Sequence, residues 1–153
     1  MKKLIAVFLI FCSSAQASVT FLDLSLGMKM NEVKIILSKT LPKSCIEIEG
    51  NTIELNDVRI LDYRFGQGSL VFKDSVLCFA GFRNFEKVAT FLTLFDNVHA
   101  KYGNFLDSSK KMKYPFYFWD FGDTTIITTL TTLESNKEYS ITTLIFQWKN
   151  TVG

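Results

Sequence analysis

An apolar stripe along one predicted helix constrains the fold of this chain more than any other feature. Between Asn84 and Gly103, large apolar side chains recur at spacings of three and four residues: Phe85, Val88, Phe91, Leu92, Phe95, Val98 and Tyr102. That spacing is typical of one face of a helix. Asn84 is a suitable N-cap, Glu86 lies in the first turn, and Gly103 provides the C-terminal stop. A stripe this broad has to be covered, and we expect a sheet to cover it.

Alternation with a period of two predicts antiparallel strands on both sides of this helix. Before the helix, the expected strands are 46–49, 58–65, 69–73 and 76–82. After the helix, they are 114–121, 124–133 and 139–148. Turns between the early strands are expected at Gly50-Asn51, Gly66-Gln67-Gly68 and Asp74-Ser75.

A shorter helix is predicted over residues 31–40, near the start of the chain. Its apolar face carries Val33, Ile36 and Leu37, and Pro42 stands just past its end. The order of elements predicts an α+β fold. In that fold two helices pack on an antiparallel sheet in the order helix, strands, helix, strands, as a weak tandem repeat of one unit.

The first 17 residues have the pattern of a cleavable secretory signal peptide. A basic start is followed by an apolar run over 4–11 and by Ala15-Gln16-Ala17, a suitable cleavage site. The run is much shorter than the roughly 20 residues that cross a bilayer. Phe11 before Cys12 does not fit a lipidation site, which has a small residue there. We therefore expect residues 18–153 to form a single α+β domain, periplasmic or secreted, with no stable membrane insertion after cleavage.

Charge gives no argument for a nucleic-acid partner. The signal segment carries two of the 17 basic residues and none of the 15 acidic ones, so the remaining chain has 15 of each and is formally neutral. Neutrality equally removes an electrostatic argument for an anionic membrane. The local cluster Lys110, Lys111 and Lys113 is interpreted as a solvated loop.

Two cysteines remain after cleavage, Cys45 and Cys78. In an oxidising compartment, an even pair in a small domain predicts a disulfide. Two separate buried thiols are the alternative.

Residues 26–33 (LGMKMNEV) resemble a helix-entry motif of small exported bacterial proteins. Gly27, Met28, Glu32 and Val33 match it, and Lys29 stands where Ser or Thr is expected. The motif is that of the outer-membrane assembly lipoprotein family (SmpA/OmlA) and of β-lactamase-inhibitor-like domains. The resemblance implies a helical segment packed on an antiparallel sheet. It also implies a non-enzymatic module that binds another protein in or near the envelope.

Candidates for catalysis are few. His99, the one histidine, lies at the edge of the long helix's apolar stripe and is interpreted as a packing residue. Glu47 and Glu49 share one face of a strand about 7 Å apart. Paired carboxylates can hydrolyse glycosides, but an exposed strand face explains them as well. One histidine and two cysteines leave too few ligands for zinc. We predict no catalytic, cofactor or metal site.

Aromatic side chains are abundant, with 15 Phe, 5 Tyr and 2 Trp, and they are densest over 114–119. Exposed aromatic patches often mark protein interfaces. The predicted interface residues are Tyr114, Phe116, Tyr117, Phe118 and Trp119. An aromatic core filled from both faces is the alternative.

The sequence thus predicts an exported, soluble protein-binding module of the bacterial envelope. It would be accessory or inhibitor-like, without catalysis, and its partner would be an unidentified envelope or secreted protein. The alternative is an extracytoplasmic hydrolase built on carboxylates.

Overall fold

The computed structural model describes residues 19–105, 107–108, 116–132 and 139–148. Strands account for 55% of the structure, and the fold is mostly β. The predicted α+β class, with a helix–strands–helix–strands arrangement, is therefore wrong. The strands are longer than expected and join into one sheet, so they contain more residues than the two helices that pack on it.

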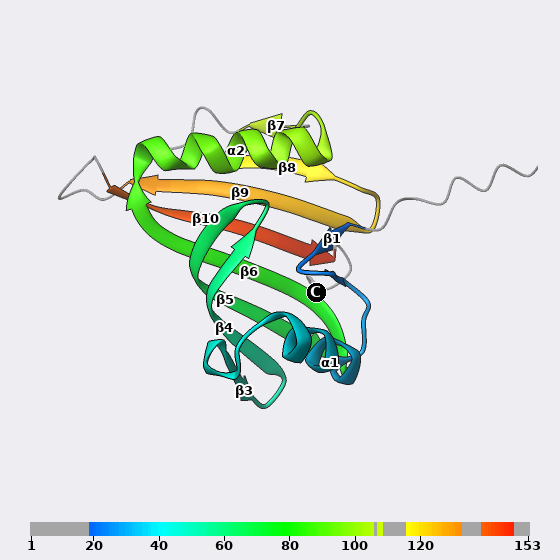
Figure 1. The fold of residues 1–153 in the computed structure, drawn as a ribbon. Helices are drawn as coiled ribbons and strands as arrows, with labels where there is room; N and C mark the ends of the chain where they lie inside the picture. The colour runs from blue at the N-terminus through cyan, green and yellow to red at the C-terminus, as the bar shows by residue number, and fades with distance from the viewer. Residues whose placement is uncertain (1–18, 106, 109–115, 133–138, 149–153) are drawn as a thin grey trace, which may run out of the picture.

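One antiparallel sheet runs through the molecule (Figure 1). Its strands, in spatial order, are β3 (Ile46–Glu49), β4 (Thr52–Ile60), β5 (Tyr63–Lys73), β6 (Val76–Lys87), β10 (Tyr139–Trp148), β9 (Thr124–Thr132), β8 (Phe116–Asp120) and the two-residue β7 (Asp107–Ser108). A separate two-stranded sheet consists of β1 (Thr20–Phe21) and β2 (Leu24–Ser25). The helices are α1 (Met30–Thr40) and α2 (Val88–Tyr102), and a short 3-10 turn covers Lys43–Cys45.

The β4–β5 hairpin turns at a place where the sequence predicts a single strand. Leu61 and Asp62 have φ angles of 54° and 60°, as a two-residue hairpin loop with both residues left-handed requires. The expected strand 58–65 is therefore divided between β4 and β5. The expected turn at Gly66-Gln67-Gly68 instead lies inside β5. The turn at Asp74 and Ser75, with φ angles of 52° and 64°, is confirmed.

Strand β6 continues through the predicted start of the long helix. Asn84, the expected N-cap, lies inside β6, and its side-chain Nδ2 donates to the carbonyl of Arg64 at 3.1 Å. The next residue, Phe85, pairs with Ile141 of β10. The helix begins only at Val88 because pairing with β10 keeps the preceding residues extended.

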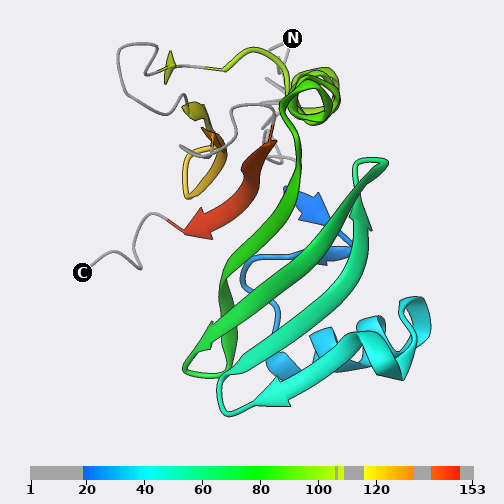
Figure 2. The same cartoon turned by 90° about the vertical axis from the view of Figure 1, so that its left-hand side faces the viewer.

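Both helices and the β1–β2 hairpin pack on the same face of the sheet. Figures 1 and 2 show α2 beside β8, β9 and β10, and α1 at the other end near β3 to β6. Val33 and Leu37 of α1 and Leu94 and Val98 of α2 belong to one continuous buried cluster. The hydroxyl of Tyr102 donates to the carbonyl of Thr20 at 2.9 Å and so ties α2 to β1; burial raises the pKa of this hydroxyl.

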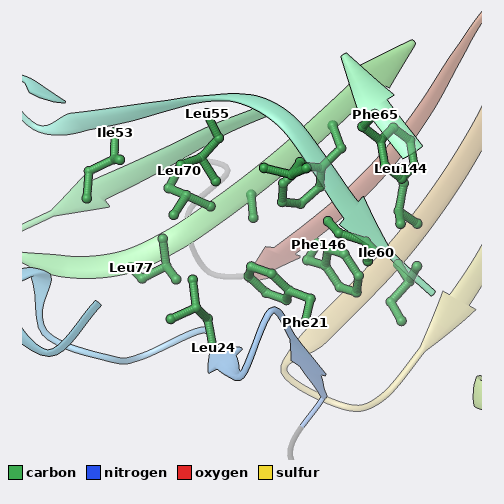
Figure 3. Close-up of a cluster of buried hydrophobic side chains, with 14 of the residues drawn as sticks. Phe21, Leu24, Ile53, Leu55, Ile60, Phe65, Leu70, Leu77, Leu144 and Phe146 are labelled. Carbon is green, nitrogen blue, oxygen red and sulfur yellow. The ribbon is translucent and has the colours of Figure 1, made fainter. Parts of the chain in front are cut away.

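Phe146 on β10 lies at the centre of this core. Its side chain is fully buried, and its ring stacks on Phe21 with centroids 4.4 Å apart. Phe82 and Tyr102 meet the same ring edge-on, each at 6.4 Å. Figure 3 shows Phe21 and Leu24 pointing at the sheet residues from the hairpin side. The core is therefore closed by the hairpin as well as by the helices.

Several buried hydroxyl groups on the core side of the sheet have no hydrogen-bond partner among the described residues. They are those of Tyr63, Thr128, Ser140 and Thr142. Thr128, Ser140 and Thr142 are each 0% exposed. A buried hydroxyl without a partner costs free energy because it has lost its bonds to water.

We expect Thr142→Val to raise the free energy of unfolding by about 1 kcal/mol, since valine keeps the shape and removes the unsatisfied hydroxyl. Urea unfolding followed by circular dichroism measures the change. Thr143→Val on the same strand is the matched control, because the Thr143 hydroxyl is hydrogen-bonded to that of Thr129. A Thr142→Val protein less stable than the parent would contradict the assignment of this hydroxyl as unsatisfied.

Candidate functional site

The candidate site is the face of the sheet opposite the helices, which we call the uncovered face. One row of side chains crosses it from β3 to β8, in register: Glu47, Glu54, Ser69, Gly81, Ile145, Ile127 and Phe118. The apolar members of this row keep partial exposure and stand outside the buried core cluster. Within the part of the chain that the structure describes, no helix packs on this face.

A shallow hollow of about 550 Å³ lies on the uncovered face. It is lined by Glu47, Glu54, Leu55, Asn56, Gln67, Gly68, Ser69, Phe79, Gly81, Phe82, Arg83, Thr143 and Ile145. Gly81 forms part of its floor, and a Cβ there would lie 2.9 Å from the ring of Phe79. The ring of Phe79 can lie against the strand only because residue 81 has no side chain.

The rim of the hollow carries charges of both signs. Glu47 on β3 stands directly opposite Glu54 on β4, and the hydroxyl of Ser69 donates to Glu54 Oε1 at 2.8 Å. On the far side, Arg83 Nε donates to Gln67 Oε1 at 2.6 Å. Glu54 and Arg83 therefore use neutral side chains as hydrogen-bond partners.

An ion pair between Arg64 and Asp57 lies outside the hollow. Arg64 holds Asp57 through two hydrogen bonds, one of them from Nη2 to Oδ2 at 3.0 Å. The hydrogen bond from Arg64 and its positive charge lower the pKa of the Asp57 carboxyl. This exposed pair is a poor candidate for proton transfer, because its carboxylate is held in the charged form.

An apolar patch adjoins the hollow. Phe85 on β6 and Ile141 on β10 are cross-strand neighbours, and they are 58% and 38% exposed. With Gly66, Gln67, Arg83 and Asn84 they line a second hollow of about 390 Å³. Gln67 and Arg83 line both hollows. The uncovered face therefore combines an exposed apolar patch with a charged rim.

The predicted aromatic interface is divided between two environments. Trp119 is buried, at 1% exposure, and its indole Nε1 donates to the carbonyl of Gly103 at 2.8 Å. Tyr117 packs on Phe95 of α2, with ring centroids 4.4 Å apart. Trp119 is therefore a core residue and Tyr117 packs, partly buried, against the core, as the alternative interpretation holds.

Among the described side chains of the predicted interface, Phe118 lies on the uncovered face, in the row described above. Tyr114 and the side chain of Phe116 lie outside the described residues. So do the lysine cluster at 110–113 and the signal segment 1–17.

Cys45 and Cys78 are both free in the structure. Cys45 precedes β3 and Cys78 lies in β6, so three strand spacings separate them. At about 4.8 Å per spacing this is about 14 Å, whereas a disulfide needs Cα atoms within roughly 7 Å. The predicted disulfide is therefore not formed in this fold. The buried thiol of Cys78 donates instead to the carbonyl of Val71 at 3.3 Å.

The catalytic candidates are not brought together. His99 is exposed on α2, with its ring 6.1 Å from that of Phe95. Glu47 and Glu49 are both exposed, and Glu47 but not Glu49 lines the hollow. Within the described ranges, His, Cys, Asp and Glu side chains nowhere form a group of three that could hold a metal ion. Neither of the two described helices has the length and apolar character needed to cross a membrane.

Sequence reasoning missed Phe85, Ile141 and Arg83 as site residues. Phe85 was assigned to the apolar stripe of the long helix, and its true position depends on how far β6 extends. The alternation of Phe79, Gly81, Arg83 and Phe85 is a period-two signal that points to one strand face. The helical spacing that begins at the same phenylalanine obscures this signal.

Comparison of the chain with protein-family models, curated proteins and solved structures finds no match. The class of protein is therefore inferred from the sequence patterns and from the geometry of the uncovered face.

Proposed function

We propose that this chain is an exported protein-binding module of the bacterial envelope, accessory or inhibitor-like, and that it binds through the uncovered face. The observation that carries the proposal is the exposed Phe85–Ile141 pair beside a hollow with charged rims. An apolar centre bounded by polar and charged side chains is the usual composition of a protein interface.

The uncovered face also has the geometry of an interface rather than that of a substrate pocket. Its two hollows are open and share one sheet surface, whereas small-molecule sites are concave and enclose most of the ligand. The signal-like segment and the resemblance to envelope proteins support the location outside the cytoplasm.

The test is an affinity capture from an envelope extract, with the chain from Ser18 to Gly153 as bait. We expect a stoichiometric partner that the parent bait retains and that an Ile141→Lys bait loses, because the lysine places a charge in the apolar patch. Leu92→Lys is the matched control. Leu92 is 63% exposed on α2, which packs on the other side of the sheet.

Equal capture by the parent and the Ile141→Lys bait would show that the uncovered face is not the binding surface. Loss of capture with both lysine variants would indicate general damage, which circular dichroism of the baits detects. If the parent bait retains no partner, either foreign or its own chain, the proposed function fails.

A further inference from the structure

We propose that the partner of the uncovered face is a second copy of this chain, bound face to face about a two-fold axis. This inference rests on the proposed function, because it requires the uncovered face to be a protein-binding surface. It is carried by the distribution of charge around the hollow.

The rim charges are self-complementary. Glu47 and Glu54 form an acidic corner on β3 and β4, and Arg83 on β6 lies two to three strands away. That separation is about 10–14 Å at the usual strand spacing. In a two-fold interface, residue i meets residue j and residue j meets residue i. If the two-fold axis lies between the acidic corner and Arg83, then Arg83 of each copy faces the acidic corner of the other copy. The same ion contact is therefore formed twice.

An oppositely charged partner would stabilise both the acidic corner and Arg83. Like charges directly opposite on neighbouring strands are destabilising, and Glu47 stands opposite Glu54. Ser69 provides the acidic corner with a neutral donor. Arg83 has a neutral amide oxygen as its partner. A second copy would supply Arg83 to the acidic corner and the acidic corner to Arg83.

The position of the axis limits the area that the two copies share. An axis between the acidic corner and Arg83 matches the β3 edge of one copy with about β10 of the other, four strand spacings away, or about 19 Å. The rows from Phe79 to Phe85 span about 20 Å along β6. The product is about 400 Å² per copy, or about 800 Å² in total, which is the size of a weak, reversible contact. The Phe85–Ile141 patch lies at the edge of this contact.

Sedimentation of the chain from Ser18 to Gly153 over a range of concentrations tests the proposal. We expect a reversible monomer–dimer equilibrium. Two variants reverse the charges: Glu47→Lys with Glu54→Lys, and Arg83→Glu. Each alone should weaken self-association by about 10-fold or more, because like charges then meet across the interface. Asp96→Lys, at an exposed position of α2 on the other side of the sheet, is the control and should leave the dimer unchanged.

Mixing the two charge-reversed variants is the decisive measurement. In the mixed dimer, the introduced lysines of one copy face the introduced glutamate of the other. The unchanged Arg83 of the first copy then faces the native acidic corner of the second. The mixture should therefore associate about 10-fold more tightly than either variant alone. Restored association excludes a merely structural effect of the substitutions, since both variants are then shown to be folded and competent.

Two results would overturn the second copy as partner. One is a parent chain that stays monomeric at its highest soluble concentration, and the other is a mixture no tighter than its components. If the parent is monomeric but the envelope capture yields a foreign protein that depends on Ile141, the dimer is wrong and the proposed function stands. If the capture is empty as well, both are wrong.

Discussion

Replacement of Phe146 by alanine is expected to lower the free energy of unfolding by about 4 kcal/mol. Phe146 is fully buried and contacts the rings of Phe21, Phe82 and Tyr102. Truncation removes its buried area and leaves a cavity that three surrounding rings cannot readily fill. Since small domains have total stabilities of about 5–15 kcal/mol, much of the stability would be lost. Urea unfolding followed by circular dichroism gives the value.

Ile141→Ala on the same strand is the control for the Phe146 prediction. Ile141 points to the opposite face of the sheet and keeps 38% of its surface exposed. Its truncation should cost under about 1 kcal/mol, as surface substitutions usually do. If the two alanine variants lost similar stability, the assignment of the core to the helix side of the sheet would be wrong.

Gly68→Ala is expected to lower the free energy of unfolding by about 2–3 kcal/mol, in spite of adding only one methyl group. A Cβ at this position would lie 2.6 Å and 2.8 Å from two ring carbons of Phe82. Phe82 is itself 2% exposed and packs on Phe21 and Phe65, so its ring has little room to move. Thermal or urea unfolding measures the loss.

The matched control is Gly66→Ala, two residues earlier on β5. There a Cβ would meet the side-chain oxygen of Asn84 at 3.3 Å, and the backbone φ is outside the left-handed region. We expect a loss of at most about 1 kcal/mol, which is a small effect for a point substitution. A Gly68→Ala protein as stable as Gly66→Ala would show that Phe82 is not held as described.

Local chemistry allowed several elements to be placed from the sequence. Helix α1 begins one residue before its predicted start, where Glu32 accepts a hydrogen bond from the amide of Lys29 at 3.0 Å. Helix α2 ends before Gly103, which has a φ of 83° and donates its amide to the carbonyl of His99. Such caps depend on residues within one helical turn, so a single sequence contains the information.

The candidate site could not be placed in this way, because it depends on pairing between distant segments. Phe85 fits a helix by its spacing and becomes exposed on a strand only because β6 pairs with β10 as far as Lys87 and Tyr139. The interface predicted over 114–119 failed at Trp119 for a similar reason. Alternation shows that Trp119 and Phe118 face opposite ways, but not which side of the sheet α2 covers.

By itself, the sequence determined the ends of α1 to within one residue, the C-terminal end of α2 and the tight turn at Asp74-Ser75, since these depend on neighbouring residues. The tertiary structure alone decided that one sheet joins both halves of the chain and that both described helices lie on one of its faces. It also decided that Cys45 and Cys78 stand three strands apart. Strand order and face are set by contacts between residues far apart in the chain, where burial of apolar area outweighs local preference.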